Sequence, residues 1–306
     1  MKRIYDMLVI GGGPGGYTAA LYAARAGLSV AVLEKLSAGG QMALTDTVDN
    51  YPGFPEGIDG FSLGENMQLQ AERFGAVTEL AEVLDMDLSG KEKAVHTSEG
   101  TFWGKTVVIS TGASPRKLGL PNEEFYTGKG LHYCAACDGM RYKGKTVAVL
   151  GGGDSAVADA LALARIAEKV IIVHRRDTLR ATKVYHQTLE EASNVTFLWN
   201  SEVTELLGQG KLSGIKLKHV QTGEETELSV DGVFVSIGRE PSSGLVKNYL
   251  ELDERGYIVA GENTATSLPG VYAVGDVRTK KLRQIVTAVA DGAYAAYAAE
   301  EYIAQV

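Results

Sequence analysis

The chain has 306 residues, of which 45% are hydrophobic and 22% are charged, a balance typical of a globular protein with a sizeable core. Its formal net charge of -8 argues against a general surface for nucleic acids or acidic membranes. The 37 glycines gather in tight runs, which indicates places where the backbone turns sharply or approaches a ligand. Two cysteines are too few for a secreted disulfide scaffold or a four-cysteine zinc site.

The first residues do not read as an export signal. Two basic residues follow Met1, but Asp6 interrupts the apolar run behind them, and the glycine run Gly11–Gly16 ends it. No apolar run is long enough to span a membrane. We therefore expect a cytoplasmic protein with no membrane partner, no nucleic-acid partner and no metal site.

The first predicted elements form a strand–loop–helix–strand unit. Residues Tyr5–Ile10 are a short apolar run typical of a strand, and the glycine loop Gly11–Gly16 follows them. An alanine-rich segment through about Arg25 predicts a helix, and Leu28–Leu33 predicts the next strand. Units of this kind bind nucleotides, because the glycines let the backbone reach a pyrophosphate and the helix N-terminus offers N–H groups and a positive dipole.

The same unit recurs without gaps later in the chain. Thr146–Leu150 predicts a strand, Gly151–Ala156 the glycine loop, and Lys169–Val173 the following strand. Another pair of segments also agrees, since Val107–Gly112 resembles Val233–Gly238. One glycine loop is a weak signal, but two in register predict an α/β fold with two Rossmann-like nucleotide-binding domains.

The residue that ends the second strand of each unit indicates which ribose the unit accepts. A carboxylate there pairs with a 2′-hydroxyl and repels a 2′-phosphate. Glu34 has this place in the first unit, whereas the second unit has His174 and then two arginines, with Arg180 one helical turn on. Guanidinium groups suit a phosphate dianion, so the second unit is predicted to bind NADPH. The alternative is a solvated strand end within the basic stretch His174–Lys183.

The first unit suits FAD or NAD, since neither carries a 2′-phosphate. The segment Gly270–Asp276 is typical of a final strand that delivers an aspartate to the ribityl chain of a bound cofactor, which favours FAD. The second domain is then inserted into the first. Residues 1–114 are predicted to begin the FAD-binding domain, 115–243 to form the NADPH-binding domain, and 244–306 to complete the FAD-binding domain.

The two cysteines lie a few residues before the second glycine unit. Cys134 and Cys137 can close a disulfide, and at a helix N-terminus the thiol pKa falls, so that a thiolate can attack another disulfide. A structural or zinc-binding role would need partners that are scarce in this chain. Asp138 could exchange a proton with a thiol or cap a helix, and both roles stay open. His132 is more typical of a packed or exposed histidine, so the predicted catalytic residues are Cys134, Cys137 and Asp138.

Together these motifs resemble the low-molecular-weight thioredoxin reductases of bacteria, plants and fungi, over essentially the whole chain. The resemblance is carried by Gly11–Gly16, Gly39–Gln41, Asn50–Gly53, Cys134–Gly139, Gly151–Ala156, His174–Asp177, Gly275–Asp276 and Arg283–Gln284. It implies a class II pyridine nucleotide-disulfide oxidoreductase, a homodimeric flavoprotein whose FAD and NADPH domains are each a three-layer α/β unit.

The resemblance also implies an activity. Electrons would pass from NADPH through FAD and the Cys134–Cys137 disulfide to oxidised thioredoxin, with a rotation of the domains between the half-reactions. Cys137 would take electrons from the flavin, and Cys134 would attack thioredoxin.

The glycine units and the resemblance give a set of cofactor-binding candidates. Those for FAD are Gly11, Gly13, Pro14, Gly16, Glu34, Lys35, Gly40, Gln41, Asn50, Val83, Thr111, Gly112, Gly275, Asp276, Arg283, Gln284 and Ile285. Those for NADPH are Gly151, Gly153, Asp154, Ser155, His174, Arg175, Arg176, Arg180, Gly238 and Arg239.

The chain departs from the commonest family pattern at two places. Ala136 stands where threonine is usual, and Lys129 stands where an arginine often precedes the redox loop. The alternatives are an FAD disulfide reductase that serves another protein disulfide, a ferredoxin- or oxygen-coupled dithiol flavoenzyme, and a nucleotide sensor without turnover. The arginines that follow His174 argue against the second, and the intact cysteine pair argues against the third.

Overall fold

The computed structural model describes residues 3–45, 47–182, 187–189 and 191–306. The chain divides into two compact units, one formed by Met1–Ser114 with Glu240–Val306 and the other by Pro115–Arg239. Two short strands, β7 (Ala113–Pro115) and β16 (Arg239–Pro241), pair with each other where the chain passes between the units. The second unit is thus a single insertion into the first.

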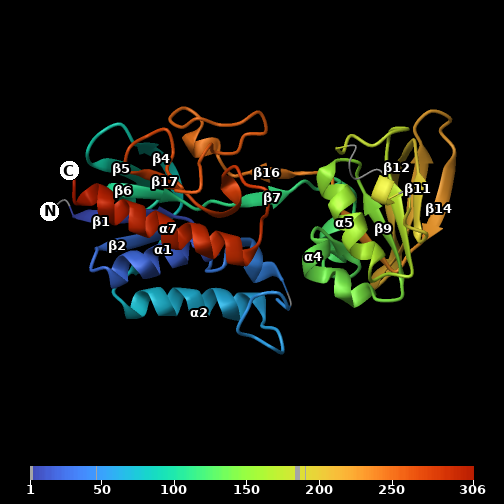
Figure 1. Ribbon diagram of the computed structural model, residues 1–306, viewed down its shortest axis with the longest axis horizontal. Helices are drawn as coiled ribbons and strands as arrows, with labels where there is room; N and C mark the ends of the chain where they lie inside the picture. Colours follow the sequence, from blue (N-terminus) through green and yellow to red (C-terminus); the bar gives the residue numbers. More distant parts are fainter. Residues whose placement is uncertain (1–2, 46, 183–186, 190) are drawn as a thin grey trace. The chain divides into compact units, whose positions relative to one another are not determined.

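The first unit is built on a seven-stranded sheet with the order β3-β2-β1-β6-β5-β4, in which β17 also pairs with β6 (Figure 1). The strands β3, β2, β1, β6 and β17 are parallel, whereas β4 and β5 continue the sheet in antiparallel fashion. Their bounds are β1 Ile4–Ile10, β2 Val30–Glu34, β3 Val77–Leu80, β4 Val83–Asp87, β5 Lys93–Thr97, β6 Gly100–Ile109 and β17 Val271–Ala273.

Alternate residues of β1 are buried on opposite faces of this sheet. Met7 and Val9 pack on the layer of helices α1 (Pro14–Arg25) and α7 (Ile285–Ile303). Leu8 and Ile10 face the opposite core, which includes residues of β4 and β5. Helices α1 and α7 approach closely because small residues line their contact, and a Cβ on Gly292 would clash with backbone of α1. The remaining helices of this unit are α2 (Gly60–Arg73) and the short 3-10 helices η1 (Gly40–Leu44), η3 (Gly244–Val246) and η4 (Gly275–Val277).

The second unit combines a five-stranded parallel sheet, β11-β10-β9-β15-β8, with a three-stranded antiparallel sheet, β12-β13-β14. The bounds are β8 Leu131–His132, β9 Thr146–Leu150, β10 Lys169–Val173, β11 Val195–Leu198, β12 Ser201–Gln209, β13 Lys211–His219, β14 Glu225–Ser229 and β15 Gly232–Val235. Its described helices are α3 Glu123–Tyr126, α4 Ala135–Asp138, η2 Gly139–Tyr142 and α5 Asp154–Ala164.

The parallel sheet of the second unit is covered on both faces. Val147 and Val149 of β9 pack with the apolar side of α5, while Ala148 and Leu150 pack with the three-stranded sheet. This unit therefore has helix, sheet and sheet as its three layers, and its central strands are apolar throughout because neither face meets water.

The repeat predicted from the sequence is present in both units. The succession β1–α1–β2 matches β9–α5–β10, and β6 and β15 each pair in parallel with the first strand of their unit. Two strand starts differ, because β1 starts at Ile4 rather than Tyr5 and β2 starts at Val30 rather than Leu28. Gly27, with φ of 84°, and Leu28 still donate hydrogen bonds to carbonyls of α1, so they end the helix. Among the described residues, no helix is long and apolar enough to cross a membrane.

Candidate active site

The first glycine loop joins β1 to α1 at the carboxyl end of the sheet. Gly11 has φ of 97°, and a Cβ there would lie 2.5 Å from the carbonyl oxygen of Ser110. A Cβ on Gly13 would meet no described atom within 4 Å. Helix α1 begins at Pro14, and glycine at its N-cap offers no side-chain acceptor to the first N–H groups. The loop thus presents open backbone and a helix N-terminus, the arrangement that receives a pyrophosphate.

Glu34 ends β2 beside this loop. Its Oε2 accepts the N–H of Gly12 at 2.7 Å, and its Oε1 accepts the N–H of Leu36 at 3.0 Å. The N–H of Gly39 donates to the carbonyl of Gly12 at 2.8 Å, which brings the segment with Gly40 and Gln41 against the loop. The carboxylate is therefore held at the strand end where an adenosine ribose would lie.

Two predicted FAD residues far apart in the sequence meet directly. The Nδ2 of Asn50 donates to Oε1 of Gln284 at 2.9 Å. Gln284 is the N-cap of α7, which starts at Ile285, and it forms a capping box with Thr287. Asn50 is thereby tied to the residue that starts α7, and a shared role of the two residues in binding FAD stays a prediction.

The turn after β17 is fixed by a buried charged cluster. Gly275 has φ of 71°, and its N–H donates to Oδ2 of Asp291 at 2.9 Å. The same carboxylate accepts from Nη2 of Arg278 at 2.9 Å and from Nζ of Lys280 at 2.7 Å. The Nε of Arg283 donates to the carbonyl of Asp276 at 3.4 Å. Sequence reasoning singled out the turn but missed Asp291, which holds it.

Three other FAD candidates have neighbours that do not point to a ligand. Lys35 forms an exposed ion pair with Glu82, with Nζ and Oε1 at 3.3 Å. Val83 packs on the core of the first unit. Thr111 donates to the carbonyl of Ser242 at 2.7 Å, next to Gly112, whose carbonyl accepts the N–H of Ser242. Their binding roles stay predictions.

The second glycine loop repeats the features of the first. Gly151 has φ of 142°, a Cβ on Gly153 would meet no described atom within 4 Å, and α5 starts directly after this glycine N-cap. The N–H of Arg180 donates to the carbonyl of Gly152 at 2.7 Å, as the N–H of Gly39 does to Gly12. Ser155 is exposed in the first turn of α5.

His174 is placed differently from its counterpart Glu34. Its ring lies beneath the loop, where a Cβ on Gly152 would come within 2.5 Å of it, and its Nε2 has no hydrogen-bond partner among the described residues. Burial, followed by the charges of the nearby arginines, lowers the pKa of His174 below its ordinary value. The histidine thus supports the loop as a neutral ring, while Arg175, Arg176 and Arg180 are exposed. Lys183, at the end of the basic stretch, lies outside the described residues.

The other NADPH candidates take part in contacts within the protein itself. Oδ1 of Asp154 accepts the N–H and the hydroxyl of Thr182 at 2.8 and 3.0 Å. Gly238 has φ of 115°, its carbonyl accepts the N–H of Arg116, and Arg239 begins β16. Direct contact of these residues with a nucleotide stays a prediction.

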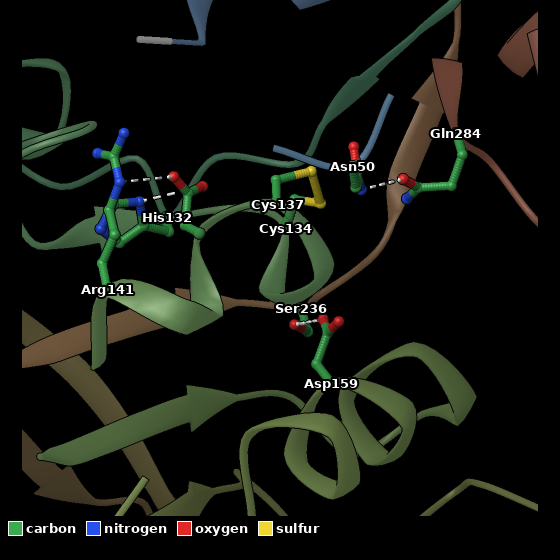
Figure 2. The surroundings of a disulfide bond; sticks show 9 residues. Asn50, His132, Cys134, Cys137, Arg141, Asp159, Ser236 and Gln284 are labelled. Atoms are coloured by element: carbon green, nitrogen blue, oxygen red, sulfur yellow. Dashed lines mark hydrogen bonds and ion pairs between the residues drawn. A yellow bond between two sulfur atoms is a disulfide. The ribbon is translucent and has the colours of Figure 1, made fainter. Parts of the chain in front are cut away.

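Cys134 and Cys137 form a disulfide, with their Cα atoms 5.3 Å apart (Figure 2). Cys134 is the N-cap of α4, and its carbonyl accepts the N–H of Asp138 at 3.1 Å. Both cysteines are partly exposed, and Ala136 between them is exposed. The expectation that the pair opens a helix is confirmed, and its partial exposure is what thiol–disulfide exchange requires.

Asp138 belongs to a chain of polar side chains. Its Oδ2 lies 3.2 Å from Nδ1 of His132, and its Oδ1 lies 3.9 Å from Nε of Arg141. The Nε2 of His132 lies 2.7 Å from the hydroxyl of Tyr142. As the N-cap residue of η2, Asp138 makes no capping hydrogen bond with its side chain. The side chain thus caps neither helix end described here, and proton exchange with a thiol stays a prediction.

His132 and Tyr142 are the residues that sequence reasoning missed here. Burial, followed by the charge of Asp138, raises the pKa of Tyr142 to about 12, so its hydroxyl keeps its proton and can donate to His132. If it donates, Nδ1 is the ring nitrogen left to donate towards Asp138. The sequence signal for His132 was its place next to the redox loop, where the structure has the two-residue strand β8. Nothing in the sequence pattern indicated which way its ring points.

The chain is similar to known proteins over its whole length. The family model for pyridine nucleotide-disulphide oxidoreductases matches residues 5–292. A thioredoxin reductase of Streptomyces coelicolor is 46% identical, with 99% of this chain and 95% of the relative covered. The crystal structure of thioredoxin reductase from Streptococcus pyogenes has a TM-score of 0.93 at 43% identity, with both chains fully covered. Thioredoxin reductase from Giardia duodenalis has a TM-score of 0.92 at 34% identity and covers 99% of this chain and 100% of that chain.

These similarities confirm the resemblance on which the residue assignments were based and the predicted fold of two Rossmann-like units. Two glycine loops at sheet ends and a redox-capable cysteine pair agree with them. The chain belongs to the pyridine nucleotide-disulphide oxidoreductase family and is an oxidoreductase.

Proposed function

We propose that this protein is an NADPH-dependent thioredoxin-disulfide reductase that uses FAD. The observation that carries the proposal is the Cys134–Cys137 disulfide at the start of α4, in the same compact unit as the second glycine loop. The relatives described above are named thioredoxin reductases, which supports thioredoxin as the partner.

The residues of the two units fit the two cofactors. Gly13 and Gly153 leave open space where a phosphate would approach, and each precedes a helix N-terminus. Glu34 would hold the adenosine ribose of FAD, whereas Arg175 and Arg176 would face the 2′-phosphate of NADPH. When bound, the two cofactors supply the electron pair that reduces the disulfide.

The chemistry of the cysteines is thiol–disulfide exchange. Reduction breaks the S–S bond and adds two electrons and two protons, which gives two thiols. One thiol loses its proton and attacks a sulfur of the partner's disulfide, so that a mixed disulfide forms and a partner thiolate leaves and takes up a proton. The other cysteine then loses its proton and attacks the mixed disulfide, which restores the Cys134–Cys137 bond. The second partner thiolate leaves and takes up a proton, so the partner is released as a dithiol.

Two features of Asp138 support a role in moving the protons of this exchange. It directly follows Cys137, and His132 and Arg141 hold its carboxylate from two sides. We assign it the role of general acid and base for the thiols. The homodimer, the cytoplasmic location and the rotation of domains stay predictions from the resemblance.

The test is NADPH oxidation in the presence of oxidised thioredoxin. We expect the wild-type protein to turn over, and Cys134→Ser and Cys137→Ser each to abolish turnover. Ala136→Ser is the matched control, because it adds a hydroxyl at the exposed position between the cysteines and leaves the disulfide intact. Full activity of a cysteine variant would contradict the proposal. Turnover with a different protein disulfide but not with thioredoxin would show that thioredoxin is not the partner.

A further inference from the structure

A buried carboxylate binds the residue that precedes the redox pair. Glu123, on α3, is 4% exposed. Its Oε1 accepts the hydroxyl of Tyr133 at 2.6 Å and the N–H of Leu118 at 2.7 Å, and its Oε2 accepts the N–H of Gly119 at 2.8 Å. Three donors from two other segments thus satisfy one buried carboxylate, which is the condition under which such a group is tolerated away from water.

Tyr133 lies in the short connection that carries Cys134. Strand β8 ends at His132 and helix α4 starts at Ala135, so Tyr133 and Cys134 alone join them. The ring of Tyr133 packs on an apolar core of the second unit, while its hydroxyl donates to Glu123. Burial, followed by the hydrogen bond with Glu123 and by its charge, raises the pKa of Tyr133, so the hydroxyl keeps its proton and remains a donor. The side chain directly before Cys134 is thus held at both its ring and its hydroxyl.

We propose that Tyr133 is a positioning residue for the redox pair, and that its hydrogen bond with Glu123 holds Cys134 where it closes the disulfide with Cys137. This anchor limits the movement of Cys134 in the dithiol, so that less conformational entropy is lost when the S–S bond forms. The disulfide is thereby favoured over the dithiol, and the pair gives up its two electrons more readily. The hydroxyl itself takes no part in the exchange and acts through the main chain.

Tyr126 offers a matched control in the same helix as Glu123. It is 5% exposed, its ring belongs to the core on which Tyr133 packs, and its hydroxyl donates to the carbonyl of Gly208 at 2.9 Å. Phenylalanine at either tyrosine keeps the ring and removes one hydroxyl with its hydrogen bond. Both variants should therefore lose some stability, but Tyr126 lies outside the connection that carries Cys134.

The test is the redox equilibrium of the cysteine pair. The purified holoenzyme is equilibrated in buffers of reduced and oxidised dithiothreitol, which exchange two electrons and two protons with the pair. It is then acid-quenched, and its free thiols are counted by alkylation. The chain has two cysteines, so the count reports this pair alone. In Tyr133→Phe we expect the ratio of disulfide to dithiol in a given buffer to fall about threefold, a shift that the loss of one net hydrogen bond can cause.

The ratio in Tyr126→Phe should stay at the wild-type value. The proposal is wrong if Tyr133→Phe keeps the wild-type ratio. It is also wrong if Tyr126→Phe lowers the ratio as far as Tyr133→Phe does, because the cause would then be a general loss of stability. The role of Tyr133 in electron transfer rests on the proposed function, but the assay contains neither NADPH nor thioredoxin. The two can therefore fail separately, since a protein that does not reduce thioredoxin can still show the shift, and one that does can lack it.

Discussion

His132 links two other side chains through opposite edges of its ring. Tyr142 meets Nε2, and Asp138 lies near Nδ1. The ring also stacks on Phe234, with centroids 5.4 Å apart, so its orientation is fixed by packing as well as by hydrogen bonds. Asp138 is thereby held by a buried, oriented partner.

We predict that His132→Phe slows thioredoxin reduction about tenfold or more, since general acid–base catalysis is worth roughly 10²–10⁴-fold and the variant disturbs it through Asp138. Phenylalanine keeps the ring in its stack and removes both polar contacts. The measurement is kcat as a function of pH, and we expect the pH profile of the variant to differ from that of the wild type. Tyr142→Phe removes the hydroxyl alone and should have a smaller effect. A wild-type rate and pH profile for His132→Phe would show that His132 does not act on the exchange through Asp138.

Asp291 gives a prediction for stability. Burial alone would raise its pKa, but the hydrogen bonds and charges of Arg278 and Lys280 outweigh burial and lower it. Asp291→Asn would leave two cations buried without a counter-charge, which we expect to cost about 3–5 kcal/mol of unfolding free energy at neutral pH.

The pH dependence of this difference follows from the lowered pKa. The contribution of Asp291 is present above the ordinary carboxyl value of 3.8 and is lost as the pH falls from there through its lower folded value. Urea unfolding at several pH values measures it. Asp85→Asn, on the exposed side of β4, is the control and should change stability by less than about 0.5 kcal/mol. A pH-independent difference for Asp291→Asn would show that its charge is not the cause.

At the scale of elements, different glycines of a glycine loop serve helix packing and ligand binding. A Cβ on Gly16 would clash with the carbonyl of Gly11, whereas a Cβ on Gly13 would meet no described atom within 4 Å. Gly16 thus allows the helix to pack closely on the strand, whereas Gly13 leaves room for a ligand.

We predict that Gly16→Ala lowers stability by about 1–3 kcal/mol, the usual cost of overpacking. Gly13→Ala should leave the stability of the cofactor-free protein unchanged and weaken FAD retention. Thermal unfolding of cofactor-stripped protein and the flavin content after dialysis measure the two effects. Equal loss of stability in both variants would contradict this division of roles.

The sequence predicts these elements because local signals agree in them. Apolar runs of strand length, glycine loops and alanine-rich helices place β1, α1, β9, α5 and β10. The antiparallel strands β12, β13 and β14 were not predicted, since their exposed polar residues give a weaker pattern. Contacts such as Asp159 with Ser236 also could not be foreseen, because they depend on which helix packs beside the end of β15.

At the scale of the whole molecule, duplication explains the architecture. Two units with the same strand–loop–helix–strand start hold different strand-end residues, Glu34 in one and His174 in the other. The sequence indicated both through the equal spacing from Gly11 and Gly151. It could not show that the histidine lies beneath its loop while the arginines remain exposed, because side-chain direction at a strand end depends on the packed neighbours.

The most direct test of the central claim is an anaerobic titration of the purified holoenzyme with NADPH or NADH, followed by oxidised thioredoxin. We predict that the flavin absorbance falls far more readily with NADPH than with NADH, and that thioredoxin restores it. Arg175→Ala with Arg176→Ala should remove most of the preference for NADPH. No loss of flavin absorbance with NADPH, or no recovery with thioredoxin, would contradict the account.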